Sequence, residues 1–308
     1  MLTKLIRFAL INTILLLSSF ATASDTHPQV VAFAQDTMAN DFRKNQVFEV
    51  QDELAKSPGV SFIYSDAQGK IALMVRQIDK FIQQKVDVLI VGTNDEKAVV
   101  PVVSKATKQG IPVIILDRGI QGEDYTTFIN SDNKKIGKIA AQYIASKLSG
   151  KGLVLLFEGI QEADVTQLRS KGFLDEIGKY KKIRTIKRTG NYLRKDAVIE
   201  MDKLIKKGIR VDAIFSESDS MLSGVRSVLR RYKIDPGSII MVGCDYTSEA
   251  QQAIRDGSQT GSVLFPLGGK EAAQIALRIL AGKKVPRHIS NPVTLVTRKN
   301  VDLVPPIF

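Results

Sequence analysis

Short apolar runs alternate with longer amphipathic stretches along the chain from Pro28 onward. Runs such as QVVAFAQ at 29–35 and VDVLIVGT at 86–93 are typical of strands that are buried on both faces. Residues 41–57 instead repeat their apolar side chains at helical spacing, which indicates a helix with one buried face. The pattern therefore predicts a chain in which strands and helices follow one another in turn.

The same pattern continues almost to the C-terminus. The expected strands cover residues 29–35, 60–66, 86–93, 111–117, 126–132, 152–159, 182–189, 211–218, 238–245, 259–265 and 293–301. The expected helices cover residues 41–57, 72–84, 98–110, 134–150, 164–179, 194–208, 221–232, 247–257 and 270–282. Such alternation predicts parallel sheets that are covered by helices on both faces.

The length of the chain points to more than one hydrophobic core. It has 308 residues, and a single core rarely grows beyond about 250–300 residues. The elements fall into two series, of which the second begins near residue 152. No linker rich in Pro, Gly or Ser separates the series, so we expect the chain to cross between the two units several times. The expected fold class is α/β, with two doubly wound parallel-sheet lobes.

The first 23 residues have the features of an export signal. Lys4 and Arg7 precede an apolar stretch at 8–20 that is too short to span a membrane comfortably. Residues 21–23, Ala-Thr-Ala, match the small-x-small pattern that signal peptidase cleaves. We expect cleavage before Ser24 and release into the periplasm, with an uncleaved membrane anchor as the alternative. Because no cysteine directly follows the apolar stretch, a lipid anchor is not expected.

The chain is basic, with 44 Lys and Arg residues against 32 Asp and Glu residues and a net charge of +12. A basic balance is one mark of proteins that bind nucleic acids. Here the positive residues are scattered, and no zinc-finger spacing, basic zipper or RNA-binding signature accompanies them. The charge therefore predicts a solvated basic surface, and no nucleic-acid partner is expected.

Scarcity of cysteine and histidine excludes several kinds of chemistry. Cys244 is the single cysteine, so neither an internal disulfide nor a thiolate metal cluster is possible. His27 and His288 lie near opposite chain ends and are expected at the surface. Phosphate-binding GxxxxGK[ST], dinucleotide-binding GxGxxG and nucleophile GxSxG motifs are all missing. We expect no cofactor, no metal and no catalysis, although paired carboxylates for glycoside cleavage stay open as an alternative.

Polar residues gather where the expected strands end. In open parallel sheets, ligands bind beyond the carboxyl ends of the strands. These ends hold Asp, Asn, Arg and Ser residues, which suit a neutral polyhydroxyl ligand because carboxylates accept from hydroxyls and Arg donates to them. The segments are 35–36, 92–95, 117–118, 158–159, 216–219 and 243–245, with 40–43 following the first strand.

Structural roles compete with ligand binding at several of these positions. Asn94 and Asp219 are candidates for helix N-caps, because Asn and Asp often cap the helix that follows a strand. Asp117 and Arg118 are also compatible with an exposed ion pair. Arg169 falls within an expected helix, where it could equally face solvent.

Five short motifs resemble the ribose-binding group of periplasmic binding proteins. They are ILDR at 115–118, INSDN at 129–133, RSKGF at 169–173, SDSMLSG at 218–224 and VGCD at 242–245. The similarity covers essentially the whole chain after the export signal, in order. It implies a type I fold in which an N-terminal lobe (24–130 and 266–292) and a C-terminal lobe (131–265 and 293–308) are joined by three crossing strands. Such a protein closes on a sugar and presents it to an ABC importer, a chemoreceptor or a sensor kinase.

The resemblance also implies which residues contact the ligand. The family's contacts fall on Asn40, Phe42, Arg43, Asp117, Arg118, Arg169 and Asp245. Two further contact positions depart from the family, because Ser218 stands where an Asn is usual and Phe265 where a Gln is usual. The aromatic-Arg pair at 42–43 resembles the variant found in binders of furanose sugars. These departures predict a ligand other than ribose, unless Phe265 turns into the hinge core instead.

The same fold forms the effector domain of LacI-type repressors, which carry an N-terminal DNA-binding segment. The export signal occupies that place here, so a repressor is not expected. A periplasmic sugar hydrolase or isomerase is the rival from another class. The nearer rival is a sensory subunit that docks on a histidine kinase and whose ligand need not be a sugar. The protein itself is expected to be a monomer.

Overall fold

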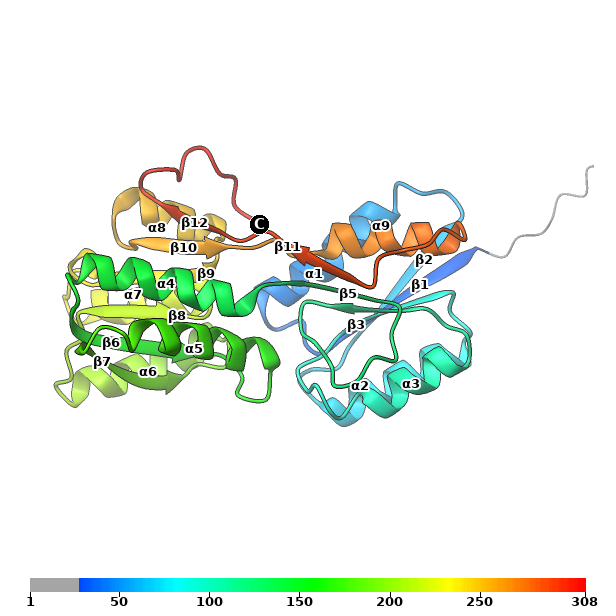
Figure 1. Ribbon diagram of the computed structural model, residues 1–308, viewed down its shortest axis with the longest axis horizontal. Helices are drawn as coiled ribbons and strands as arrows, with labels where there is room; N and C mark the ends of the chain where they lie inside the picture. The colour runs from blue at the N-terminus through cyan, green and yellow to red at the C-terminus, as the bar shows by residue number, and fades with distance from the viewer. Residues whose placement is uncertain (1–27) are drawn as a thin grey trace, which may run out of the picture.

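The computed structural model of the protein describes residues 28–308. The predicted export signal and His27 lie outside the described residues. Two α/β lobes lie side by side, each built on a six-stranded sheet (Figure 1). The predicted fold class, two doubly wound lobes with predominantly parallel sheets, is confirmed.

The N-terminal lobe has the strand order β11-β5-β4-β3-β1-β2. Its strands are β1 (Gln29–Gln35), β2 (Val60–Asp66), β3 (Val88–Gly92), β4 (Val113–Leu116), β5 (Thr127–Ser131) and β11 (His288–Asn291), all paired in parallel. Helices α1 (Asp41–Leu54) and α9 (Gly269–Leu280) cover one face of the sheet. Helices α2 (Ile71–Gln83) and α3 (Val100–Lys108) cover the other (Figure 1).

The C-terminal lobe has the strand order β12-β10-β9-β8-β6-β7. Its strands are β6 (Lys151–Glu158), β7 (Lys182–Thr189), β8 (Ala213–Ser216), β9 (Ile240–Asp245), β10 (Gly261–Leu264) and β12 (Thr294–Thr297). Helices α4 (Asn133–Lys147) and α5 (Asp164–Ile177) pack on one face, and α6 (Arg194–Lys206) and α7 (Asp219–Arg231) on the other. Helix α8 (Ser248–Asp256) and a 3-10 turn (Pro236–Ser238) complete the lobe.

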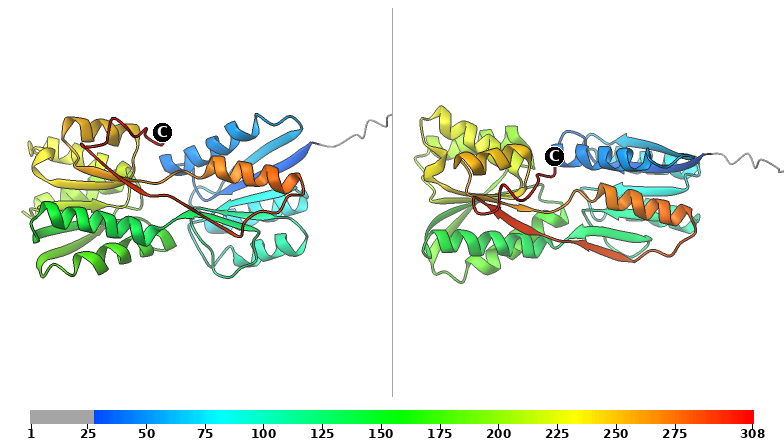
Figure 2. Two further views of the ribbon diagram at one scale, coloured as in Figure 1. Left: turned by 45° about the horizontal axis from the view of Figure 1, so that its top comes forward. Right: turned by 90° about the horizontal axis from the view of Figure 1, so that it is seen from above.

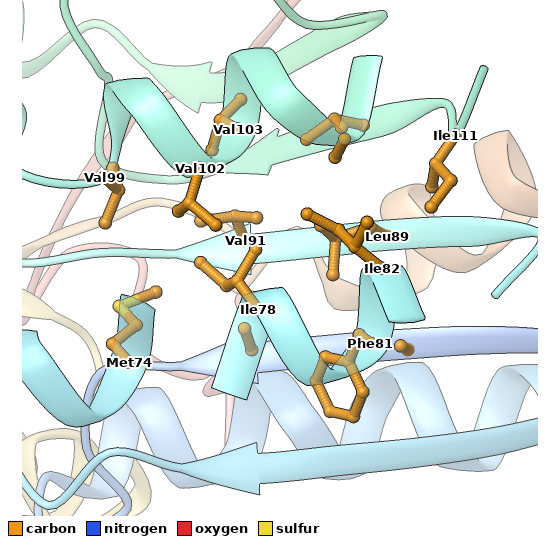
Figure 3. Close-up of a cluster of buried hydrophobic side chains, with 14 of the residues drawn as sticks. Met74, Ile78, Phe81, Ile82, Leu89, Val91, Val99, Val102, Val103 and Ile111 are labelled. Carbon is orange, nitrogen blue, oxygen red and sulfur yellow. The ribbon is translucent and has the colours of Figure 1, made fainter. Parts of the chain in front are cut away.

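The central strand β3 shows why the strand sequences are continuously apolar. Leu89 and Val91 point into the core beneath α2 and α3, whereas Val88 and Ile90 point into the core beneath α1 and α9. Figure 3 shows the first of these cores, in which Leu89 and Val91 meet side chains of α2 and α3. Because successive side chains enter opposite cores, every position of the strand must be apolar.

Three segments connect the lobes, as the two views in Figure 2 show. They are the joins from β5 to α4, from β10 to α9 and from β11 to β12. The exact division of residues between the lobes stays our proposal.

Strict alternation of strand and helix is wrong where β5 directly follows β4 and again at the end of the chain. After α9 come two consecutive short strands, of which β11 was not predicted and β12 is shorter than the expected strand at 293–301. Strand β12 also runs antiparallel to β10, with Gly261 opposite Thr297. The sequence HISN of β11 is too short and too polar to give a strand signal. His288 is exposed there, as expected, and its ring stacks on Phe128.

Part of the basic charge lies on β7, the edge strand of the C-terminal sheet. Lys182, Arg184 and Lys187 on this strand are exposed. Charged side chains on an edge strand discourage pairing with other chains.

Among the described residues, no helix is long and apolar enough to cross a membrane.

Helices α4 and α5 approach each other at two glycines. A Cβ atom on Gly137 would lie 2.0 Å from the carbonyl oxygen of Arg169, and one on Gly172 would lie 2.1 Å from that of Lys134. Such distances leave room for no side chain, so both positions require glycine. The close packing also fixes the backbone of α5 at Arg169, which faces the cleft between the lobes.

Gly137→Ala is therefore expected to destabilise the protein. Alanine favours a helix over glycine by about 1 kcal/mol, but the clash with the α5 backbone outweighs this, and we expect a net loss of about 1–3 kcal/mol. Urea denaturation measures the change. Lys138→Ala, at the exposed neighbouring position, is the matched control and should change stability by less than about 0.5 kcal/mol. A Gly137→Ala protein as stable as the wild type would contradict this account of the packing.

Candidate ligand-binding site

All nine predicted site residues line one cleft between the lobes, where the carboxyl ends of both sheets meet. The lining residues are Asn40, Phe42, Arg43, Asp117, Arg118, Val165, Arg169, Tyr192, Ser218, Asp245 and Phe265. The empty space among them, part of which is open to solvent, is about 280 Å³. The cleft is thus suited to a small ligand.

The start of α1 supplies the first part of the N-terminal wall. The Asn40 side chain caps this helix by accepting a hydrogen bond of 3.1 Å from the Arg43 backbone N–H. The cap sets Phe42 and Arg43 in the first turn, facing the cleft. Arg43 is only 1% exposed and donates to Gln46 Oε1 over 2.9 Å.

A buried charge network surrounds Arg43. Its Nη1 lies 3.2 Å from Asp117 Oδ2, and its Nε lies 3.6 Å from Asp36 Oδ1. Asp36 also accepts a hydrogen bond of 2.9 Å from Arg118 Nη1. Burial, followed by the nearby Arg118, lowers the pKa of Arg43, while Asp36 and Asp117 oppose this shift. The network holds two arginines against two aspartates at the ends of β1 and β4.

Asp117 and Arg118 are both buried, so an exposed ion pair between them is ruled out. Each instead pairs with another residue of the charge network. Asp117 has a φ of 66°, a left-handed conformation that is uncommon for a residue other than glycine. Its backbone N–H is held by the Ile129 carbonyl at 2.7 Å. Such conformations persist where the surroundings impose them, often at ligand sites.

Two donors of the network have no partner among the described residues. They are Arg43 Nη2 and Arg118 Nε, and both are buried. An unpaired buried donor is costly, on the order of 1–3 kcal/mol, and buried donors in native proteins are nearly always satisfied. Both belong to residues that line the cleft, so oxygen atoms of a ligand are suitable acceptors for them.

Arg169 dominates the C-terminal wall. It is 3% exposed, so the interpretation of a solvent-facing side chain is wrong. Its Nε donates to Asn133 Oδ1 over 2.7 Å and its Nη1 to the Glu217 carbonyl over 3.0 Å. Although burial acts to lower the pKa of Arg169, the neighbouring Tyr192 and other acidic groups raise it overall. The guanidinium is therefore a fixed, permanently charged donor.

Asp245 lies across the cleft floor at the end of β9. It is 4% exposed and has a φ of 98°, again a left-handed conformation. Burial, and then the nearby Asp219, hold the pKa of Asp245 well above its ordinary value, and Arg169 only partly opposes this. A carboxyl in such surroundings is suited to hydrogen bonding with ligand hydroxyls in either direction.

Two aromatic rings form the apolar part of the cleft. The rings of Phe42 and Phe265 lie 5.3 Å apart, one from each side of the hinge. The Arg169 guanidinium lies over the Phe265 ring at 4.6 Å from its centroid. Phe265 also packs in the core of the C-terminal lobe, so it combines the two roles that the sequence left open.

The residue that caps helix α7 is Ser218 and not Asp219, which was the candidate from the sequence. Ser218 is the N-cap of α7 and accepts a hydrogen bond from the Met221 N–H, which leaves its own hydroxyl proton for another acceptor. The capping interpretation of Asp219 is thus wrong. Asp219 instead accepts hydrogen bonds from Tyr246 N–H, the Ser262 hydroxyl and Gln259 Nε2. This network fixes the backbone next to Asp245.

Tyr192 and Val165 line the cleft but were not predicted. The Tyr192 ring lies under the Arg118 guanidinium at 5.3 Å, and its hydroxyl is 2.6 Å from Thr166 Oγ1. Tyr192 follows the end of β7, so the strand-end rule would have found it had that end been included. Val165 gives no such signal, because an apolar residue in a helix is usually part of the core.

Direct hydrogen bonds join the two walls. Asn40 Nδ2 donates to the Tyr192 carbonyl over 2.9 Å, and the Gly119 N–H donates to Asp164 Oδ2 over 2.9 Å. Burial raises the pKa of Asp164 to about 6, although its hydrogen bond from Gly119 acts in the opposite direction. The lobes are therefore in contact across the cleft, in a closed arrangement.

Comparison with known proteins places this geometry in a family. A family model described as a periplasmic binding protein domain matches residues 31–284. Ribose import binding protein RbsB of Bacillus subtilis (strain 168) is 30% identical over 271 residues, which is 87% of this chain and 87% of that protein. Galactofuranose-binding protein YtfQ of Escherichia coli (strain K12) is 27% identical over 256 residues, covering 80% of this chain and 79% of that protein.

Solved structures of periplasmic binding proteins have a fold similar to that of this chain. The fructose-binding periplasmic domain of a hybrid two-component system superposes with a TM-score of 0.84 at 27% identity, covering 89% of this chain and 92% of that one. The binding protein of an arabinose ABC transporter from Shewanella sp. ANA-3, solved with L-arabinofuranose, gives a TM-score of 0.84 at 25% identity and covers 89% and 94% of the two chains. The resemblance that the sequence motifs indicated is confirmed, and the chain belongs to the family of periplasmic binding proteins.

Proposed function

We propose that the protein binds a small polar ligand in this cleft, closes its two lobes around it and presents it to a partner at the membrane. The observation that carries the proposal is the placement of charged groups on both walls of one cleft. Arg43 and Asp117 come from the N-terminal lobe, and Arg169 and Asp245 from the C-terminal lobe. A ligand that contacts both walls favours the closed form by its differential affinity.

A neutral polyhydroxyl compound, most simply a monosaccharide, suits the cleft best. Carboxylates accept from hydroxyl groups, and guanidinium groups donate to hydroxyl and ring oxygens. The three arginines lie among three aspartate side chains, so the cleft offers a neutral ligand both donors and acceptors. The aspartates are Asp36, Asp117 and Asp245. The small volume of the cleft argues for a single sugar unit rather than a chain.

The aromatic wall favours a sugar other than ribose. Phe265 offers no hydrogen bond, so a hydroxyl buried against it would lose on the order of 1–3 kcal/mol. A furanose or a deoxysugar with an apolar edge would instead place carbon against Phe42 and Phe265. Named ligands of the similar proteins include galactofuranose, L-arabinofuranose and fructose as well as ribose. Non-sugar polar metabolites remain the second ligand class.

The proposed output is delivery to an ABC importer. Similar proteins include a ribose import protein and a binding component of an arabinose ABC transporter. The alternative output is sensing through a chemoreceptor or a histidine kinase, which the similarity to a domain of a hybrid two-component system favours. In either case we propose a periplasmic monomer, exported by removal of residues 1–23. Solute binding rather than catalysis is the activity proposed.

A thermal-shift panel of pentoses, hexoses, deoxysugars, polyols and small acids is expected to identify the ligand class. Ribose should raise the melting temperature weakly or not at all, and a furanose or deoxysugar should raise it most. Phe265→Gln should strengthen the response to ribose, because the amide offers two donors and an acceptor. A strong response of the wild type to ribose alone would contradict the role given to Phe265.

Arg169→Ala should weaken binding of the best compound from that panel by roughly 30-fold or more. The reason is that loss of a desolvated charged partner costs on the order of 2–5 kcal/mol, and about 1.4 kcal/mol is tenfold in affinity. Titration calorimetry measures the change, and Asp245→Ala should also weaken binding. Lys171→Ala, at an exposed position of the same helix, is the control and should bind normally. Unchanged affinity in both cleft variants would mean that the ligand binds elsewhere.

A further inference from the structure

Behind the C-terminal wall, a buried polar cluster lies outside the cleft. We call it the Glu217 cluster; its buried members are Glu158, Ser170 and Glu217, and the exposed Lys187 of β7 reaches it from the surface. Glu158 ends β6, Ser170 lies on α5, and Glu217 directly follows β8. Glu217 is 0% exposed and Glu158 is 6% exposed. Two buried carboxyl groups that share one hydroxyl partner need an explanation, because two negative charges so close together would repel each other.

The hydrogen bonds of Ser170 indicate how many protons the carboxyl groups of Glu158 and Glu217 hold between them. Its Oγ lies 2.8 Å from Glu217 Oε1 and 2.9 Å from Glu158 Oε1. A hydroxyl carries one proton and can donate to only one of these oxygens. Ionised carboxylates only accept, so with both ionised one of the two contacts would lack a proton. Both short contacts are satisfied when one carboxyl is protonated and donates to Ser170.

The surroundings identify the protonated carboxyl as that of Glu217. Lys187 Nζ lies 2.8 Å from Glu158 Oε1, which favours ionised Glu158. Among the described residues, the Glu217 carboxyl has no ion pair, and its other oxygen accepts the Gly159 N–H over 2.9 Å. Burial raises the pKa of Glu217 to about 7; Glu158 acts in the same direction, whereas Gly159, Arg169 and Ser170 oppose the shift.

We propose that Glu217 stays a neutral carboxylic acid in the folded protein on the acid side of neutrality and acts as a positioning residue for the C-terminal wall of the cleft. Its hydroxyl donates to Ser170, and Ser170 donates to the ionised Glu158. The main-chain carbonyl of Glu217 then accepts from Arg169 Nη1 over 3.0 Å. A neutral donor at this point locks the backbone turn that holds Arg169 toward the cleft.

Ionisation of Glu217 would disturb two residues that line the cleft. The Tyr192 hydroxyl is 3.5 Å from Glu217 Oε2 and 2.6 Å from Thr166 Oγ1, so it bonds mainly to the threonine. A full charge on Glu217 would attract this hydroxyl and the Arg169 guanidinium together. The charge of Glu217 also bears on Cys244 of β9, whose thiol stays neutral because burial raises its pKa well above the ordinary value. The cluster therefore makes the shape of the cleft depend on pH near neutrality.

The pH dependence of stability tests the proposal without any ligand. A group whose folded pKa is raised contributes stability that is present below its unfolded pKa and is lost as the pH rises through its folded pKa. For Glu217 that window runs from its ordinary value of 4.5 to about 7. Glu217→Gln keeps a neutral donor and acceptor in the same place but cannot ionise. We expect the two proteins to have similar stability at about pH 5 and the variant to be more stable at about pH 8.

The size of the stability difference between the wild type and Glu217→Gln is set by how far the pKa of Glu217 is raised. Between about pH 5 and 7, the unfolded-to-folded ratio of the wild type should rise relative to that of Glu217→Gln by about tenfold for each pH unit. Glu158→Gln is the matched comparison, because it removes the partner of Lys187; it should be destabilised at both pH values. If Glu217→Gln were destabilised equally at both, Glu217 would act as a carboxylate and the proposal would be wrong.

Infrared titration supplies a second readout, which needs no stable Glu217 variant. The wild type should show the carbonyl band of a protonated carboxylic acid that disappears with a midpoint near pH 7; because the pKa values of Asp164 and Asp245 are also raised, the band is assigned to Glu217 by its response to a change at Ser170. Ser170→Ala should move this midpoint, because it removes the hydroxyl between the two carboxyl groups. If no such band titrates near neutrality, the proposal fails. Neither result depends on which ligand fills the cleft, so failure here is distinguishable from failure of the proposed function.

Discussion

The structure of the cleft depends on burying arginine guanidinium groups at the ends of parallel strands. Arg43, Arg118 and Arg169 are each at most 5% exposed. Taking such ions out of water costs several kcal/mol each unless partners surround them. Asp36 and Asp117 supply these partners in one lobe. The partners exist only because the carboxyl ends of neighbouring parallel strands meet at one edge of the sheet, which brings together residues far apart in sequence.

The pairing is incomplete, and the proposed function depends on this incompleteness. Arg43 Nη2 and Arg118 Nε lack partners among residues 28–308, and they belong to one lobe. Asp245 and the Arg169 guanidinium face them from the other lobe. Under the proposed function, a polyhydroxyl ligand supplies oxygen atoms to both sets at once. Direct contacts such as that between Asn40 and Tyr192 complete the closed arrangement but leave the unpaired donors for the ligand.

Most of the fold follows from the sequence because apolar runs mark strands that are buried on both faces. The expected helices and most strands lie where predicted, but β11 was not predicted, since four residues on an edge with one apolar side chain carry no periodic signal. The nine residues that strand ends and motifs predicted for the site all line the cleft. Their pairing was not predicted, because sequence does not tell which carboxylate meets which arginine. Asp36 stood at a predicted strand end, yet its bond to Arg118 spans 82 positions of the chain.

The sequence did not predict the role of residues for which that role depends on their surroundings in the folded protein. Asp219 has the sequence context of a helix cap, but Ser218 takes that place and Asp219 is drawn into a network with Ser262. Glu217 is one of 32 acidic residues by composition, and only its position between Ser170 and Gly159 makes it distinctive. Burial and hydrogen-bond partners decide such roles, and both arise from the packed lobes.

The central claim is that a ligand in the cleft draws the lobes together, and an interlobe distance tests it most directly. Cys244 is buried, so spin labels can be attached selectively to added cysteines at Arg76→Cys and Lys171→Cys, exposed positions on opposite lobes. The distance distribution is measured while the compound with the largest thermal shift is added. The account predicts that a broad distribution narrows to the shorter, closed distance at saturation. A distribution that stays unchanged while the compound binds would contradict it.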